Sequence, residues 1–403
     1  MAATSSPTPL SSRELWTVLG AGAVALLVVH GLGRFYYTPL LPYLVSDGVL
    51  SSSEAASLAT WNYLGYLMGA MLAIRWHRVD HIRFLLPLSL VVHLVTSLLQ
   101  TQIENVDLQD AVRWLNGVAN GIVFVQAPAL ILEWLVRRNR ASLSGLVYLG
   151  VGIGLLVSSA MVSLSADWLS GAGRWWPALV LSVPLCWWAW RVLRELDVPV
   201  TGPGETEHTP AKPGKSPLFD RASIPLFLSY AGAGLGYILP MTFLPLLATM
   251  QLAPGDWLVD GSWLIVALAT IPSAWIWNHL GARIGDRLAL RLNFVVQLLG
   301  VLAAVIWPGP VGIVLCGVLV GGTFLGSVLL TQRIARALHP HQGPRLSAAM
   351  VALYAFAQMA GPWLVKQWLD AGGTLESGFW IGVGALVWGL VFALLVPAQA
   401  PRR

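Results

Sequence analysis

Charged residues are scarce in this chain. Only 11% of its 403 residues are Asp, Glu, Lys or Arg, whereas 56% are hydrophobic. A soluble domain carries about 25% charged residues, so a water-soluble globule of this size is excluded. We therefore expect the chain to lie in a lipid bilayer, where its 20 tryptophans suit the interfacial belts. The net charge of +5 needs no nucleic-acid partner, and none is expected.

Cysteine is rarer still. Cys186 and Cys316 each stand alone in an apolar segment, where a small buried hydrophobe is the ordinary role, so we expect neither a disulfide framework nor a metal site. The eight histidines show no metal-type pairing with carboxylates. The convergent nucleophile, base or metal ligands that an intramembrane enzyme needs are not visible in the sequence. We expect no enzyme, no cofactor and no metal.

Long apolar runs are abundant. About 20 apolar residues in a row are enough to cross a bilayer as a helix. Twelve such stretches lie near residues 16–42, 55–74, 84–100, 111–133, 142–165, 174–193, 222–249, 260–280, 289–307, 311–331, 346–368 and 378–397. The expected fold class is all-α integral membrane with 12 transmembrane helices. The polar N-terminal stretch has no basic region or cleavage site, so no signal peptide is expected.

The distribution of basic residues predicts the orientation. With the N-terminus inside, 20 of the 24 Lys and Arg residues fall on the cytoplasmic side, in agreement with the positive-inside rule. The four that fall elsewhere are Arg34, Arg113, Arg174 and Lys366. Both termini are therefore expected in the cytoplasm.

The chain divides into two similar halves. Residues 194–221 are rich in Pro, Gly and charge and are typical of a flexible linker. Four landmarks of the first helix, Gly31, Gly33, Leu41 and Pro42, recur 203 residues later as Gly234, Gly236, Leu244 and Pro245. Six helices per copy is an even number, so the copies insert with the same polarity. The expected division is a tail (1–15), a six-helix bundle (16–193), the linker, a second six-helix bundle (222–397) and a tail (398–403).

Several motifs resemble those of the major facilitator superfamily. GARIGDRLALR (281–291) is similar to its loop signature, RWLNGVANG (113–121) to its fourth-helix Arg-Gly-Gly pattern, and Asp80 stands in the first-half counterpart of the loop. GRFYYTPLLP (33–42), NYLGYLMGA (62–70) and GLGYILPMTFLP (234–245) are similar to the YbfB-type branch. The resemblance implies two parallel six-helix bundles and a transporter. It also implies that Asp80, Asp286, Arg287 and Arg291 close a cytoplasmic gate, although an ordinary positive-inside loop is the alternative.

Arg34 is the most unusual residue of the first span. A charge at the middle of a span costs about 2.5–3.5 kcal/mol and normally faces a bundle interior or water. Helical spacing places His30, Arg34, Tyr37 or Thr38, and Leu41 along one stripe. We expect this stripe to line a substrate path. The alternative is that Arg34 snorkels outward or bonds carbonyls freed by Pro39.

Other polar residues of the spans are further candidates for the path. His30 is either a proton carrier or a hydrogen-bonded helix contact. Arg113 is either functional or an interfacial anchor. Amides and hydroxyls can line a path or join helices. The candidates of this kind are Asn62, Asn120, Tyr237 and Gln358.

These features predict a secondary active transporter that moves a small organic solute by alternating access. Two arginines in or near the spans without a mid-span acid favour an anion such as a carboxylate. A lipophilic drug is the competing cargo, and a non-transporting membrane sensor is the competing class. The expected partners are a small-molecule substrate, protons if His30 carries them, and the bilayer. We expect a monomer in a bacterial inner membrane.

Overall fold

The computed structural model describes residues 11–198, 220–338 and 343–397, and every regular element in these ranges is a helix. Ten of the helical segments are long and apolar enough to cross a membrane. Two more, α3 (Ser52–Arg75) and α13 (Gly343–Asp370), are of similar length but fall outside that set. The described residues thus contain the twelve expected spans. The expected tail 398–403 and most of the tail 1–15 and of the linker 194–221 lie outside the described residues.

The first six spans form one bundle. Its helices are α1 (Ser12–Leu26), η1 (Leu27–Phe35), α2 (Tyr37–Ser46), α3, α4 (Val79–Gln100), α5 (Val106–Val136), η2 (Ala141–Tyr148), α6 (Leu149–Ser165), η3 (Gly171–Trp175) and α7 (Trp176–Arg194). The segments α1, η1 and α2 follow one another as the first span, Ser12–Ser46. We call this span helix 1.

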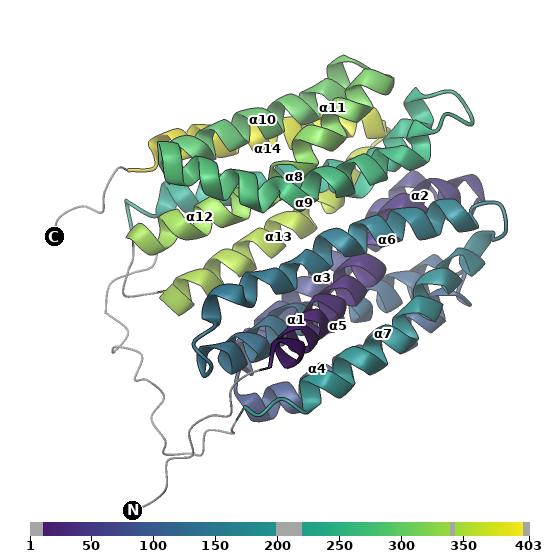
Figure 1. Cartoon of the computed structure of the whole chain (residues 1–403). Coiled ribbons are helices and arrows are strands. Elements are labelled where there is room, and N and C mark those ends of the chain that lie inside the picture. Colours follow the sequence, from purple (N-terminus) through teal and green to yellow (C-terminus); the bar gives the residue numbers. More distant parts are fainter. Residues whose placement is uncertain (1–10, 199–219, 339–342, 398–403) are drawn as a thin grey trace, which may run out of the picture.

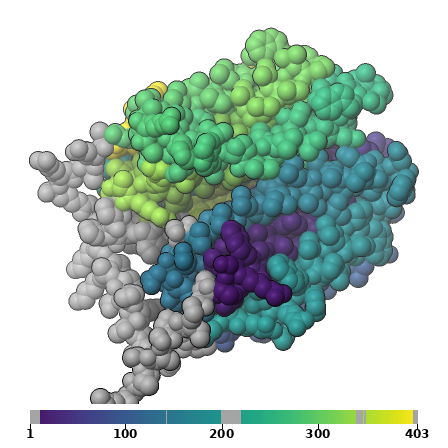
Figure 2. Space-filling view, in the orientation of Figure 1, coloured from purple at the N-terminus to yellow at the C-terminus, as the bar shows by residue number. Residues whose placement is uncertain are grey.

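The last six spans form the other bundle. Its helices are α8 (Ile224–Gln251), α9 (Leu258–Ile284), α10 (Asp286–Ile306), α11 (Pro310–Gly321), α12 (Phe324–Leu338), α13 and α14 (Leu375–Leu395). Helices α11 and α12 together make one span, Pro310–Leu338. Figure 1 shows the two bundles side by side, the first in purple to teal and the second in green to yellow. The same division is visible on the molecular surface in Figure 2. Helices α3 and α13, α6 and α9, and α2 and α8 make the main contacts between the bundles.

The two ends of the helices define two faces of the molecule. We call the end where α1 begins and α14 ends the Ser12 face, and the end where helix 1 stops the Asp47 face. Local signals fix several helix ends: the Ser11 hydroxyl accepts the Glu14 N–H, and Ser51 with Glu54 forms a capping box at the start of α3.

Helix 1 is not α-helical throughout. Its nine-residue middle, η1, is a π-helix in which every residue is buried. π-Helical turns are rare and concentrate at functional sites. At Gly31 this segment lies against α6, where a Cβ would come within 2.4 Å of the Gly154 Cα. Only glycine allows that approach of two backbones.

Candidate functional site

Arg34 lies at the end of η1 and is only 2% exposed. Its Nη2 donates a 2.7 Å hydrogen bond to Gln358 Oε1 of α13, in the other bundle. The guanidinium carbon lies 4.4 Å from the ring centres of both Tyr63 and Tyr66 of α3, a distance at which a cation is attracted to a ring face. Arg34 therefore points into the molecule and does not snorkel outward.

Donors on the Arg34 guanidinium remain free. Its Nε is buried without a hydrogen-bond partner. Among the described residues, Arg34 makes no ion pair, and Gln358 is its one hydrogen-bond acceptor. An unpartnered buried donor on a cation is costly, so this arrangement requires either water or a ligand with acceptor atoms.

Gln358 of α13 connects helix 1 and α8, which are equivalent helices of the two halves. Its Nε2 donates to the hydroxyl of Tyr237 on α8 while its Oε1 accepts from Arg34. The ring of Tyr237 lies nearly parallel to Phe324, with centroids 5.2 Å apart, and to Tyr354, at 5.5 Å. The structure thus brings together three of the expected path residues, Arg34, Tyr237 and Gln358.

His30 lies one turn before Arg34 and is 6% exposed. Its ring stacks on Phe124 at 4.1 Å and meets Tyr66 edge-on at 5.6 Å. The buried Nδ1 has no hydrogen-bond partner. His30 therefore packs among rings instead of making, through Nδ1, the hydrogen-bonded helix contact that was the alternative to a carrier.

Arg113 on α5 is 1% exposed and is not an interfacial anchor. Its Nη1 donates a 2.9 Å bond to the carbonyl of Gly33 in η1, and its guanidinium lies 4.8 Å from the Tyr37 ring centre. Asn62 of α3 in turn donates to the Arg113 carbonyl at 2.9 Å. Arg113 and Asn62 therefore tie η1 to α5 and α3, and Arg113 binds a backbone carbonyl of the π-helix.

Beyond Arg34, the residues expected along one stripe of helix 1 bond to different bundles. The Tyr37 hydroxyl donates to the carbonyl of Ala55 in the same bundle, whereas the Thr38 hydroxyl donates to the carbonyl of Met241 in the other bundle, both at 2.9 Å. Tyr37 thus packs the first bundle, and Thr38 joins the two.

A buried polar cluster beside η1 was missed by the sequence analysis except for Asn120. His93 Nδ1 lies 3.2 Å from Asn120 Oδ1, and Asn120 Nδ2 donates to Asn116 Oδ1 at 2.8 Å. A Cβ at Gly33 would lie 2.6 Å from Asn120 Nδ2. Asn116 and Asn120 are spaced four apart on one helix, which is the signal that could have revealed the cluster.

The expected gating residues lie at the Ser12 face. Asp286 pairs with Arg333 of the same bundle (N to O, 3.1 Å), and Arg291 donates to the carbonyls of Ala393 and Leu394. Asp286, Arg287 and Arg291 line one open pocket. Within the described part of the chain, Asp80 pairs with its neighbour Arg78 alone, at 3.6 Å, and both are about half exposed.

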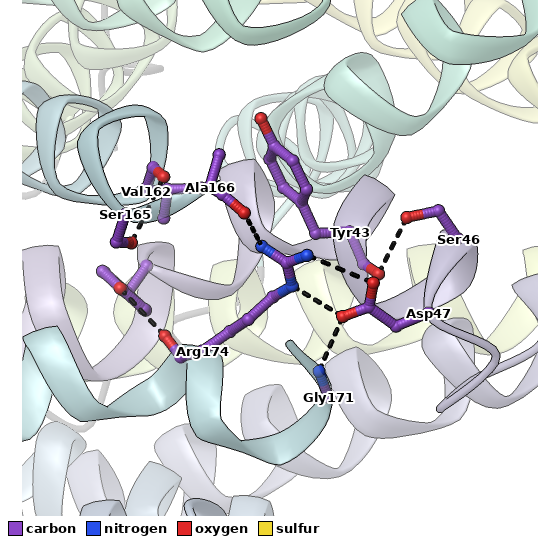
Figure 3. Close-up of polar contacts among 9 residues, drawn as sticks. Tyr43, Ser46, Asp47, Val162, Ser165, Ala166, Gly171 and Arg174 are labelled. Atoms are coloured by element: carbon purple, nitrogen blue, oxygen red, sulfur yellow. Dashed lines mark hydrogen bonds and ion pairs between the residues drawn. The ribbon is translucent and has the colours of Figure 1, made fainter. Parts of the chain in front are cut away.

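The opposite face carries a charged arrangement that the sequence analysis did not single out (Figure 3). Arg174 binds Asp47 in a two-pronged ion pair, with Nε to Oδ2 at 2.6 Å and Nη2 to Oδ1 at 3.1 Å. The arginine holds the pKa of the Asp47 carboxyl below its usual range. Arg174 also lies over the ring of Tyr43, whose hydroxyl donates to Asp260 of the second bundle at 2.6 Å. The ion pair therefore supports a residue that joins the bundles.

The hydrogen bonds between the bundles are unevenly distributed. Besides the Arg34–Gln358 bond in the interior, they lie toward the Asp47 face: Thr38–Met241, Tyr43–Asp260, Ser53–Asp370, Tyr63–Thr242 and Trp263–Ser158. Among the side chains that the structure describes, none of the hydrogen bonds or ion pairs that join the bundles lies at the Ser12 face. Hydrogen bonds thus hold the two bundles together at the Asp47 face.

No His, Cys, Asp or Glu cluster that could hold a metal ion occurs among the described residues. No curated protein matches the chain. Among solved structures, a point mutant of the nucleoside transporter NupG is similar, with a TM-score of 0.75, 13% identity, and 94% of this chain and 98% of that chain covered. NupG itself gives a TM-score of 0.71 at 13% identity, with 94% and 100% covered. At this identity the likeness shows the fold alone.

The likeness places the two bundles in the fold of a solute transporter, and a family model covers almost the whole sequence. Residues 26–395 match the model described as uncharacterised MFS-type transporter YbfB, in agreement with the resemblance of the helix 1, α3 and α8 motifs. The chain is therefore a multi-pass membrane transporter and not an enzyme, and it belongs to the YbfB-type family of the major facilitator superfamily.

Proposed function

We propose that the protein moves a small organic anion bearing a carboxylate, by alternating access, with Arg34 as the anchor for the charge. The observation that carries the proposal is the state of Arg34: a buried guanidinium with an unpartnered Nε and no acidic partner among the described residues. A planar guanidinium can hold both oxygens of a carboxylate, which gives geometry as well as charge.

The contact of Arg34 with Gln358 supports a coupling between binding and movement. Because Gln358 belongs to the other bundle and also holds Tyr237, an anion on Arg34 competes with a bond that joins the halves. A ligand shifts a conformational balance only by binding one state better than the other. Displacement of Gln358 by a carboxylate is a direct way to create that difference.

The two faces of the bundles suggest the gates. The Tyr43–Asp260 and Thr38–Met241 bonds hold the Asp47 face closed, whereas Asp286, Arg287 and Arg291 would close the Ser12 face in the opposite state. The arrangement of basic residues favours the Ser12 face as the cytoplasmic one. The proposed location is a bacterial inner membrane, with the protein acting as a monomer. His30, unpartnered at Nδ1 and one turn from Arg34, is the proposed carrier if protons drive transport.

The test is solute flux in liposomes that contain the purified protein. Uptake of carboxylates is compared with uptake of neutral and cationic lipophilic solutes, with and without a proton gradient. Saturable carboxylate flux that Arg34→Ala removes would support the proposal. Saturable flux of lipophilic solutes alone would favour a drug exporter, and saturable binding without flux of any solute would favour a sensor.

A further inference from the structure

Resting on the proposed function, we propose that the anion is a flat, conjugated monocarboxylate, such as an aromatic or heteroaromatic acid. Three features of the residues around Arg34 carry this inference: the number of free cations, the absence of an acidic neighbour, and the ring faces that both bundles contribute.

The site offers one cation for a ligand. Arg34 has an unpartnered Nε, and its guanidinium reaches Gln358 of the second bundle. Arg113 also has an unpartnered Nε, but its guanidinium binds the Gly33 carbonyl and lies 4.8 Å and 5.5 Å from the ring centres of Tyr37 and Trp175, all in the first bundle, so it is held against η1. A second carboxylate on the ligand would enter without a free partner, and an unpaired buried charge is strongly unfavourable. The solute is therefore expected to carry a single negative charge.

The site offers no anion for a ligand. Among the described residues, the polar and ring contacts of Arg34 are made by Gln358, Tyr63, Tyr66 and Phe35, and those of His30 by aromatic rings. The ammonium group of an amino acid would find no carboxylate beside the anchor. Zwitterions are therefore disfavoured along with dicarboxylates.

Ring faces surround the anchor. In the first bundle, Tyr63 and Tyr66 lie against the Arg34 guanidinium, and Phe124 stacks on His30. In the second bundle, Tyr237 lies nearly parallel to Phe324 and Tyr354, with interplanar angles of 6° and 13°. Gln358 connects Arg34 to Tyr237, so the two groups of rings meet at the anchor. Aromatic faces favour an offset flat ring over a puckered aliphatic body of similar size.

The test uses a set of probes that differ in one property each. Carrier-mediated uptake of labelled benzoate is competed with unlabelled benzoate, cyclohexanecarboxylate, benzamide, phthalate and phenylalanine. We expect benzoate to compete about threefold to tenfold better than cyclohexanecarboxylate, which has the charge but no flat ring. Benzamide, phthalate and phenylalanine should compete at least about 30-fold more weakly, because each lacks the single negative charge that the anchor accepts.

A pair of variants links the preference to the site. Tyr66→Phe keeps the ring beside Arg34 and should keep the benzoate preference, whereas Tyr66→Leu should reduce it to within about twofold of parity. The preference is a ratio measured on one protein sample, so a loss of folded protein lowers both uptakes without changing it. An unchanged ratio in Tyr66→Leu would overturn the role of the ring.

The outcomes separate this inference from the proposed function. Equal competition by benzoate and cyclohexanecarboxylate would overturn the flat-ligand inference while anion transport stands. Stronger competition by phthalate or phenylalanine would overturn the single-charge argument. If labelled benzoate and cyclohexanecarboxylate both fail to show saturable uptake while benzamide is taken up, the anion proposal itself is wrong.

Discussion

Helix 1 and α8 begin the two halves and share their landmarks 203 residues apart, yet they are built differently. Helix 1 changes to a π-helix over Leu27–Phe35 and carries Arg34 at its end. Helix α8 is α-helical throughout, although Pro240 and Pro245 lie inside it. Prolines alone therefore do not explain the irregular backbone of helix 1. One difference lies beside η1, where the buried guanidinium of Arg113 binds the Gly33 carbonyl.

The equivalence of the two helices is visible in their contact. The hydroxyl of Thr38 donates to the carbonyl of Met241, and these residues are themselves 203 positions apart. A residue can touch its own equivalent only near the axis that relates the halves, so the axis passes close to this bond. Arg34 and Tyr237 are also equivalent by this displacement, and Gln358 binds both. At this position the first half thus carries a charged side chain and the second half a neutral hydroxyl.

The largest expected effect comes from substitutions at the equivalent residues Arg34 and Tyr237. Arg34→Ala should weaken anion binding by about 30-fold to several thousand-fold, because a buried charged partner is removed, and Arg34→Lys should recover only part of it. Tyr237→Phe removes one neutral hydrogen bond and should weaken binding by about 2- to 12-fold. Binding is measured by concentration-dependent uptake in liposomes. Thermal stability in detergent is the control, and unchanged affinity in well-folded Arg34→Ala would make Arg34 structural.

The next effect compares equivalent glycines. A Cβ at Gly31 would lie 2.4 Å from the Gly154 Cα, whereas a Cβ at Gly234 would lie 3.0 Å from side-chain atoms of Ala357 and Tyr354. Backbone yields less than side chains, so Gly31→Ala should lower the free energy of unfolding by about 1–3 kcal/mol and Gly234→Ala by less. Melting temperatures in detergent measure both. Equal shifts would show that η1 can move away from α6.

A smaller effect compares the two charged loops at the Ser12 face. Asp286→Asn removes the partner of Arg333, and a partly exposed pair of this kind contributes about 1 kcal/mol, enough to shift a two-state population about fivefold. Accessibility of single cysteines at the Ser12-face helix ends should change. The matched variant Asp80→Asn breaks only an exposed pair with its neighbour and should change little. If the two variants behave alike, the Asp286 loop has no special gating role.

The smallest effect concerns Asp47, whose equivalent 203 positions later is the exposed Met250. The pKa of Asp47 is lowered in the folded protein by Arg174, so the ion pair stabilises the fold above the unfolded pKa of about 3.9. That contribution, up to about 1 kcal/mol, is lost as the pH falls from about 4 through the lower folded pKa. In Asp47→Asn the melting temperature should fall less steeply between pH 5 and pH 3, which lie about one unit on either side of the unfolded pKa. Glu104→Gln is the control. An equally steep dependence of the melting temperature on pH in Asp47→Asn would show that Asp47 is not the group responsible.

The sequence predicted the spans and the two halves because hydropathy and repetition are local properties of the chain. Arg34 stood out for the same reason, since a charge in an apolar run is visible without a structure. The π-helix was not predictable from a local run, because residues far along the chain pack against it, among them Arg113, which lies 80 positions from the carbonyl it binds. The cluster of His93 with Asn116 and Asn120 was missed because its members come from two helices. Contacts between distant residues are not encoded in a window of hydropathy.

Helix α3 has a consequence for how the protein is made. It is less apolar than the ten spans of the membrane-crossing set, and its partner across the bundles, α13, begins only at Gly343, when most of the chain has been synthesised. Until then α5 must hold it, and glycines allow this: a Cβ at Gly65 would lie 2.0 Å from the Trp114 carbonyl oxygen, and one at Gly117 2.1 Å from that of Asn62. Backbone-to-backbone packing of this kind stabilises helix pairs in lipid without hydrophobic driving force. Because both helices lie within residues 52–136, we expect this close pair to form in the bilayer before α13 is translated.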